Sequence, residues 1–272
     1  MSFTNPSEDG RRPRIGLVLS AGSYHCAAHI GVIRVLERER IPVDLVAGTS
    51  AGALAGMLYC AGLSSDQIFA ALKNLKLEHL FAPRIGSDGF ADMQPVRESL
   101  EALIGSSRQI DTFSRRFACV AANALTGDPV VISSGNAASA VQASMAVPGL
   151  VRPAIHEGQS LVDGAVVQPV PVSVAHTMGA DIVIAVDVNI PRFGMYVARH
   201  PTESIAHCFD MAMQRLSLME LNEADVVIRP QVSGFKQNLA HIDGMVKAGE
   251  IAGMAAVPLI RSFLQPAFVK TP

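Results

Sequence analysis

The sequence predicts an α/β protein, a three-layer α/β/α sandwich around a mainly parallel central sheet. Near the N-terminus two short apolar segments, 14–19 and 43–47, are each followed by a segment with helical character. Such alternation of strand and helix is typical of right-handed βαβ units and a parallel sheet. Apolar residues also make up 49% of the 272 residues, enough to bury a sheet on both faces.

Each element follows from its local pattern. Residues 14–19 (RIGLVL) carry no charge after the first, as expected of a buried strand. Residues 24–40 alternate apolar and polar positions at helical spacing, which predicts an amphipathic helix. Residues 43–47 are the next expected strand, and the nearly uncharged segment 50–61 is expected to be a buried helix. Further strands are expected at 116–122, 130–133, 181–188 and 225–228, with helices between them and a last helix over about 243–264.

We expect a single domain over residues 14–265, because single cores stop growing near roughly 250 to 300 residues. Residues 1–13 are polar, lack the apolar stretch of a secretion signal, and are expected to be flexible, while 266–272 form a short tail. The least regular region, 64–110, is predicted to be an insertion that covers the site. Its apolar part, 75–93, either packs against the sheet, the commoner outcome, or forms a lid that touches a membrane transiently.

Charge and cysteine spacing exclude several kinds of partner. The 22 Lys and Arg are balanced by 24 Asp and Glu, so no global field would hold nucleic acid. The four cysteines lack CxxC spacing, and we expect free thiols in a reducing compartment. The longest apolar stretch, 51–63, contains glycines and is shorter than the roughly 20 residues of a membrane span. We therefore expect a cytoplasmic protein.

Residues 48–52 (GTSAG) form a GxSxG pattern between an expected strand and an expected helix, which is typical of a nucleophile elbow. Gly48 and Gly52 permit a sharp turn that exposes the hydroxyl of Ser50, and the helix dipole and the amide of Ala51 stabilise negative charge nearby. A capped turn without chemistry is the simpler alternative. We favour Ser50 as a nucleophile.

A second glycine-bearing turn, 20–23 (SAGS), follows the first expected strand. Free backbone amides in such a turn form an anion-binding concavity. Adjacent parallel strands would bring both turns to one edge of the sheet, so the amides of Gly22 and Ser23 are candidates for an oxyanion hole beside Ser50. A plain connecting loop is the alternative.

A serine hydroxyl needs a base, which is either the histidine of a triad or a carboxylate acting directly. Asp163 ends an apolar run directly before Gly164, which places a carboxylate at the edge of the sheet, although an ordinary turn aspartate is the alternative. An α/β-hydrolase triad is disfavoured, because its nucleophile normally follows several strands and Ser50 follows two. The later histidines lie in no local motif: His79, His156, His176, His200, His207 and His241.

These motifs resemble the patatin-like phospholipase family, which combines a glycine-rich first turn, GxSxG and a downstream DGA or DGG. Three longer stretches also resemble it, 27–37 (AAHIGVIRVLE), 46–62 (VAGTSAGALAGMLYCAG) and 143–187. The resemblance implies a patatin-like fold. By position it implies Ser50 as the nucleophile and Asp163 as the base of a dyad that needs no histidine.

The implied activity is hydrolysis of an acyl ester or lipid, of the phospholipase, lysophospholipase or esterase type. It passes through an acyl-enzyme and needs no metal or organic cofactor. An aspartate near its reference pKa of about 3.9 is a weak base, so we expect Asp163 to be largely buried. An acyltransferase or thioesterase on the same dyad is the alternative enzyme.

The first turn departs from the family pattern, which usually resembles GGGGARG where this chain has SAGSYHC at 20–26. One glycine remains, and His25 replaces the familiar arginine. Because residues other than glycine seldom adopt positive φ, a changed direction of the amides is possible. The alternative from another functional class is therefore a degenerate protein that binds acyl chains and turns substrate over only weakly.

Overall fold

The computed structural model describes residues 11–74, 83–86, 89–91, 93–189, 200–236 and 238–264. Most of the expected N-terminal segment 1–13, most of the expected lid 75–93 and the tail 266–272 lie outside these residues. The strands are β1 (Ile15–Leu19), β2 (Leu45–Thr49), β3 (Pro83–Gly86), β4 (Gly89–Ala91), β5 (Arg116–Asn123), β6 (Pro129–Ile132), β7 (Ala154–His156), β8 (Gln159–Asp163), β9 (Ile182–Val186) and β10 (Val226–Ile228). The helices are η1 (Ser23–Cys26), α1 (Ala27–Arg38), α2 (Ala51–Cys60), α3 (Ser65–Asn74), α5 (Gln94–Ile104), η2 (Ile110–Thr112), α6 (Ala137–Ser144), η3 (Gly164–Val166), α7 (Val172–Thr177), α8 (Pro201–Leu221), η4 (Leu239–His241) and α9 (Ile242–Leu264).

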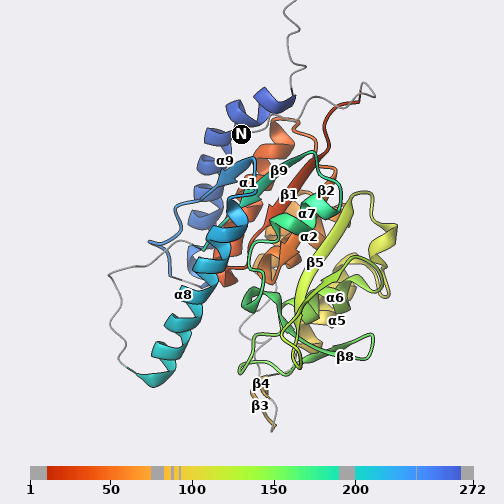
Figure 1. The fold of residues 1–272 in the computed structure, drawn as a ribbon, viewed down its shortest axis with the longest axis vertical. Helices are drawn as coiled ribbons and strands as arrows, with labels where there is room; N and C mark the ends of the chain where they lie inside the picture. The colour runs from red at the N-terminus through yellow and green to blue at the C-terminus, as the bar shows by residue number, and fades with distance from the viewer. Residues whose placement is uncertain are drawn as a thin grey trace, which may run out of the picture.

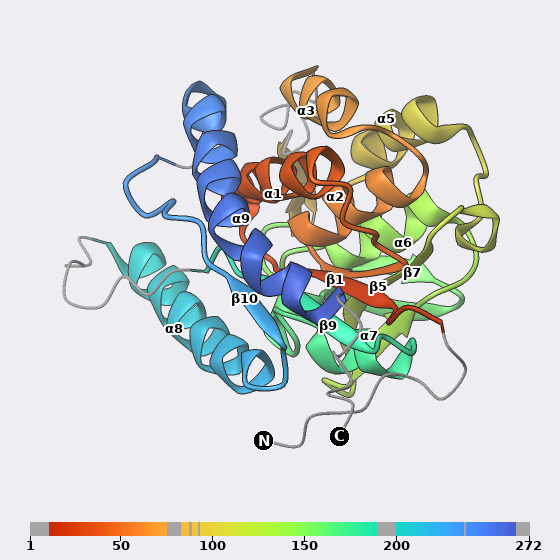
Figure 2. The ribbon, with the colours of Figure 1, turned by 90° about the horizontal axis from the view of Figure 1, so that it is seen from above.

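The described residues form a three-layer sandwich, as predicted (Figures 1 and 2). Strands that pair with each other follow the path β10-β9-β1-β2-β5-β8-β7, and β6 also pairs with β5. Successive side chains of β1 point to opposite faces, so Leu17 and Leu19 pack with α1, α2 and α9, whereas Val18 packs with α7. Helix α8 lies beside α7 on that second face (Figure 2).

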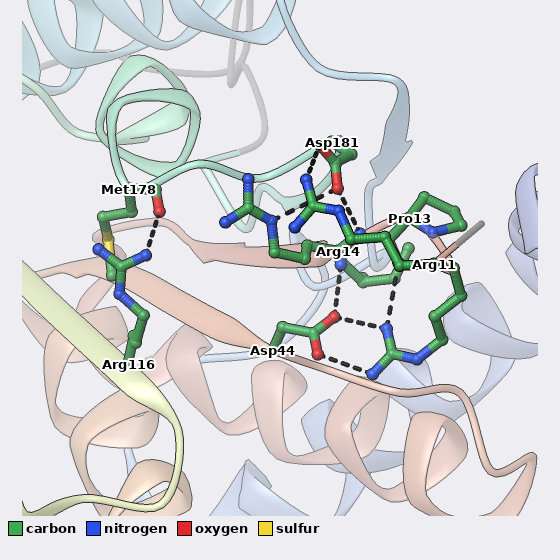
Figure 3. Close-up of polar contacts among 9 residues, drawn as sticks. Arg11, Pro13, Arg14, Asp44, Arg116, Met178 and Asp181 are labelled. Atoms are coloured by element: carbon green, nitrogen blue, oxygen red, sulfur yellow. Dashed lines mark hydrogen bonds and ion pairs between the residues drawn. The ribbon is translucent and has the colours of Figure 1, made fainter. Parts of the chain in front are cut away.

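Two carboxylates fix the beginnings of the central strands (Figure 3). Asp44 accepts a hydrogen bond from the amide of Ile15 at 2.7 Å, and Asp181 accepts one from the amide of Arg14 at 2.7 Å. The amide of Asp44 also donates to the carbonyl of Ile15 at 2.9 Å. Strand β2 begins at Leu45, two residues later than predicted.

The connection between β5 and β6 is a tight turn, so the prediction of a helix between these strands is wrong. The side-chain oxygen of Asn123 accepts hydrogen bonds from the amides of Leu125 and Thr126, and Gly127 adopts φ 77°. Such an Asx turn reverses the chain within a few residues. The strands therefore pair antiparallel.

Strands β2 and β8 lie end to end along the same edge of β5. Strand β2 pairs with residues 116–120 of β5, and β8 pairs with residues 121–123. Strand β6 pairs with residues 119–122, which overlap both sets, so β6 must occupy the other edge. The carboxyl ends of β2 and β8 consequently face each other.

Helices α1 and α9 pack with their backbones in contact. A Cβ atom added at Gly31 would lie 2.0 Å from the carbonyl oxygen of Val246, and one added at Gly249 would lie 2.0 Å from that of Ala28. The two glycines thus allow α9 to cover the outer side of α1.

Gly249→Ala is expected to lower the free energy of unfolding by about 1–3 kcal/mol, because the methyl group overlaps backbone atoms that cannot rotate away. The direction of the stability change is informative, since alanine normally stabilises a helix interior by about 1 kcal/mol relative to glycine. A loss of stability would therefore come from the close packing. Urea unfolding measures the difference. Gly234→Ala, in an exposed turn with open space around it, is the control and should change stability by less than about 0.5 kcal/mol. Equal midpoints for the wild type and Gly249→Ala would contradict the close packing.

Candidate active site

Ser50 stands on a strained turn between β2 and α2. Its backbone has φ 54° and ψ −122°, which a non-glycine residue rarely adopts. The amide of Ser50 donates a hydrogen bond to Oγ of Ser144 at 2.8 Å, and that hydroxyl donates to the carbonyl of Val120 at 2.6 Å. These bonds hold the serine in the strained conformation and project its hydroxyl from the edge of the sheet.

Asp163 is the hydrogen-bond acceptor of the Ser50 hydroxyl. Ser50 Oγ donates to Asp163 Oδ2 at 2.6 Å, and the amide of Ala165 donates to Asp163 Oδ1 at 2.8 Å. Both side chains are buried, with Ser50 8% and Asp163 2% exposed. The expectation that Asp163 is largely buried is therefore confirmed, and the structure brings the two predicted residues together.

The predicted motif glycines lie where the chain passes itself closely. A Cβ atom at Gly52 would lie 2.2 Å from the carbonyl oxygen of Leu19, and one at Gly164 would lie 2.2 Å from that of Val120. Gly48 is similarly close to the backbone of α2. Because these contacts are with backbone atoms, a side chain at Gly52 would displace α2 from β1, and one at Gly164 would displace the turn after Asp163 from β5.

Burial raises the pKa of Asp163 to about 6, although the hydrogen bonds from Ser50 and Ala165 favour the charged form. A carboxylate with this pKa is ionised at neutral pH and is a stronger base than an exposed aspartate. The site therefore holds a basic group against a hydroxyl, the arrangement that general-base activation requires.

The hydroxyl opens into a cavity of about 300 Å³. Its lining mixes apolar and polar side chains, and helix α8 contributes some of each. The apolar residues are Leu54, Leu72, Met145, Val147, Leu150, Phe209 and Met213, and the polar ones are His207, Asp210, Gln214 and Ser233. Such a mixed, largely apolar cavity suits a molecule with an apolar chain and a polar end.

The turn after β1 lines the same cavity. The amide of Ala21 is already used, because it donates to the carbonyl of Pro169 at 2.8 Å. Within the described residues the amides of Gly22 and Ser23 donate to no protein acceptor, and Ser23 adopts φ 50° despite its side chain. Gly22 and Ser23 thus line the same cavity as Ser50, and their amides have no acceptor among the described residues.

Ser144 and His29 also shape the site, although neither was predicted to do so. His29 is fully buried, and its Nε2 lies 2.9 Å from the carbonyl oxygen of Ser20, to which it donates. Burial lowers the pKa of His29 to about 4, so it stays neutral near pH 7. Neither residue had a sequence signal beyond being polar within an apolar helical run.

Cys26 also lines the cavity, but burial raises the pKa of its thiol to about 12. A protonated thiol is a poor nucleophile, so Cys26 does not compete with Ser50. Among the residues that the structure describes, no cluster of three or more His, Cys, Asp or Glu side chains could hold a metal ion. None of the described helices is both long and apolar enough to span a membrane.

Comparison with known proteins identifies the family. A family model described as patatin-like phospholipase matches residues 17–176, more than half of the chain. The chain belongs to the patatin-like phospholipase family. This confirms the resemblance predicted from the motifs, and the matched region contains both Ser50 and Asp163.

Relatives of this patatin-like chain are longer proteins. An uncharacterized NTE family protein of Mycobacterium tuberculosis is 29% identical over 282 positions, which cover 89% of this chain and 46% of the relative. Lysophospholipase nte1 of Emericella nidulans is 34% identical over 186 positions, covering 64% of this chain and 12% of the relative. The chain thus spans less than half the length of these curated relatives.

Two solved structures share the fold. VipD from Legionella pneumophila matches with a TM-score of 0.51 at 14% identity, covering 95% of this chain and 70% of that chain. The type III effector protein ExoU matches with a TM-score of 0.50 at 14% identity, covering 93% of this chain and 54% of that chain. At this level of identity the likeness concerns the fold alone.

Asp163→Asn is expected to raise the free energy of unfolding at pH 8. The folded pKa of about 6 exceeds the roughly 3.9 of an exposed aspartate. The folded wild type therefore binds the proton more tightly, so its stability falls as pH rises from about 4 to about 6 and stays lower above that. The two-unit difference corresponds to about 3 kcal/mol, which the neutral asparagine avoids.

Urea unfolding of both proteins at pH 4 and pH 8 measures this effect, and the advantage of the variant should largely disappear at pH 4. Asp111→Asn, at an exposed aspartate, is the matched control and should shift stability little at either pH. A variant no more stable than the wild type at pH 8 would contradict a costly buried carboxylate.

Proposed function

We propose that this chain is a lipid acyl hydrolase that uses a Ser50–Asp163 dyad and an acyl-enzyme intermediate. The observation that carries the proposal is the 2.6 Å hydrogen bond between Ser50 Oγ and Asp163 Oδ2 at the wall of a largely apolar cavity. Family membership and the lysophospholipase names of several relatives support the same reaction class.

In the acylation step, Ser50 Oγ attacks the carbonyl carbon of the ester while its proton passes to Asp163 Oδ2. The carbonyl oxygen becomes an oxyanion, which accepts hydrogen bonds from the amides of Gly22 and Ser23. Collapse of this tetrahedral intermediate breaks the ester C–O bond. The proton on Asp163 transfers to the departing alkoxide, so an alcohol leaves and Ser50 is acylated.

Deacylation repeats the same sequence with water. Asp163 removes a proton from a water molecule, whose oxygen attacks the acyl carbon and forms a second oxyanion in the same position. When this intermediate collapses, the proton on Asp163 returns to Ser50 Oγ and a carboxylic acid is released. One carboxylate serves both half-reactions, so no histidine is needed.

The mixed lining of the cavity favours a single-chain amphiphile such as a lysophospholipid. An acyl chain would lie against Leu54 and Leu72, and the polar end would face His207 and Asp210 on α8. A cavity of about 300 Å³ is at the small end of the range for ligand sites, which favours one chain over two.

Hydrolysis of p-nitrophenyl esters by the wild type, Ser50→Ala and Asp163→Asn tests the dyad. Each variant is expected to lose about 1,000-fold or more in kcat/KM while keeping the wild-type circular dichroism spectrum. A fluorophosphonate should label the wild type and not Ser50→Ala. The wild-type kcat/KM should rise with pH through an apparent pKa of about 6, because Asp163 must be ionised to act as a base. An unlabelled wild type would overturn the proposal, and acyl transfer to an added alcohol without free acid would favour an acyltransferase.

Met213→Trp tests the path of the acyl chain. The larger side chain is expected to fill part of the cavity and lower kcat/KM at least about tenfold for long-chain esters relative to acetate, a difference of about 1.4 kcal/mol. Met219→Trp is the matched control, since Met219 lies on the same helix, is 70% exposed and is not part of the cavity wall. The same chain-length profile in both variants would place the acyl chain elsewhere.

A further inference from the structure

Helix α8 lines the cavity, yet few of its apolar side chains are buried. Of the α8 side chains that the structure describes, Gln214, Ser217 and Leu221 are buried, and two of these three are polar. Apolar side chains of the same helix are exposed instead, with Ile205 71% and Met219 70% accessible to solvent. Contacts other than apolar packing must therefore help to hold this helix in place.

Glu220 supplies such contacts near the C-terminal end of α8. Its Oε1 accepts a hydrogen bond from Nε2 of Gln168 at 3.0 Å, and its Oε2 accepts one from the amide of Ser173 at 3.1 Å. Gln168 Nε2 also donates to Oγ of Ser173 at 2.7 Å, so the three residues form one connected group. Because the acceptor is a carboxylate, these bonds are stronger than those between neutral groups. They join α8 to the beginning of α7, its neighbour in Figure 2.

The backbone of Gln168 and Pro169 also holds two strand ends of the site. Oγ1 of Thr49, at the end of β2, donates to the carbonyl of Gln168 at 2.8 Å. The amide of Ala21, in the turn after β1, donates to the carbonyl of Pro169 at 2.8 Å. Neither bond uses the side chain of Gln168. Removal of the Glu220 carboxylate would therefore release α8 while these two bonds stay in place.

The anchored end of α8 lies close to the part that lines the cavity. Met213 and Gln214 line the cavity and precede Glu220 by about two turns, roughly 10 Å along the helix axis. The backbone hydrogen bonds of a helix keep it stiff over this length. A shift of α8 at Glu220 would therefore displace side chains that face the bound substrate.

We propose that Glu220 is a positioning residue that fixes α8 and thereby sets the fit of the cavity to long acyl chains. This inference rests on the proposed function and concerns substrate selection at the same site. Glu220 does not line the cavity and acts through Met213 and Gln214. Its removal weakens the binding of long-chain esters and leaves the chemical step on a short ester unchanged.

Hydrolysis of p-nitrophenyl acetate and p-nitrophenyl decanoate by Glu220→Ala tests this role. The variant is expected to raise KM for the decanoate at least about tenfold, while kcat for both esters and KM for the acetate stay within about threefold of the wild type. Glu220→Gln should behave as the wild type, because its side-chain oxygen still accepts a hydrogen bond from the amide of Ser173. Gln168→Ala removes the partner side chain and should change the decanoate KM in the same direction as Glu220→Ala. Glu223→Ala, at an exposed residue just after α8, is the matched control and should change neither ester.

Hydrogen exchange of the α8 amides measures the anchoring without any substrate. Exchange should be at least about tenfold faster in Glu220→Ala than in the wild type, because the released helix opens more often. Glu220→Gln and Glu223→Ala should exchange at the wild-type rate. Equal exchange in Glu220→Ala and the wild type would overturn the anchoring role of Glu220, whether or not the protein hydrolyses esters.

The kinetic outcomes separate this inference from the proposed function. A wild type that hydrolyses neither ester would overturn the proposed function and the role of Glu220 in substrate selection with it. An active wild type with an unchanged decanoate KM in Glu220→Ala and Gln168→Ala would overturn this inference alone. Equal losses on both esters, or the same loss in Glu220→Gln as in Glu220→Ala, would also overturn it, since those results indicate a general structural role or a need for the charge itself.

Discussion

Strand β5 carries β2 and β8 end to end along a single edge, and the geometry of the site depends on that pairing. Thr49 lies opposite Val120 and Asp163 opposite Ala121, so the two strand ends meet within one residue step of β5. A slip of β8 by one residue would turn the Asp163 side chain to the other face of the sheet. The hydrogen bond to Ser50 is thus a consequence of strand register, with no flexible loop between the two groups.

The same arrangement destabilises the folded protein locally. A backbone conformation such as that of Ser50 costs on the order of 1–3 kcal/mol, and burial of an ionised Asp163 opposes folding as well. The protein tolerates both costs because the packed residues around Ser50 and Asp163 leave neither of them room to move to a more favourable conformation. Backbone atoms press against Gly52 and Gly164, and Ser144 fixes the amide of Ser50. The packed core therefore does two things: it holds Asp163 rigidly beside the hydroxyl of Ser50, and it offsets the energetic cost of the strained turn and the buried carboxylate.

Much of this could be predicted from the sequence because the decisive signals are local. Apolar runs marked β1, β2 and β9, and the glycines beside Ser50 and Asp163 marked turns at strand ends. What could not be predicted depends on pairing between distant segments. No local sequence pattern shows that β7 and β8 join the sheet antiparallel and not parallel. Ser144 acquires its role only because α6 packs beside the turn after β2.

The turn after β1 shows how a glycine-rich loop can be replaced. Ser20 is fully buried, and its hydroxyl donates to the carbonyl of Ala21 at 2.9 Å and accepts from the amide of Val188 at 3.0 Å. Its own carbonyl accepts from His29, which the low pKa keeps in the neutral form. Several buried hydrogen bonds thus fix the turn, so its shape does not depend on the freedom of a second or third glycine. The polar residues that depart from the family pattern thus hold the turn in place, and the amides of Gly22 and Ser23 meet no acceptor in the part of the chain that the structure describes. Unpaired amides are what the proposed oxyanion site would need before a substrate arrives.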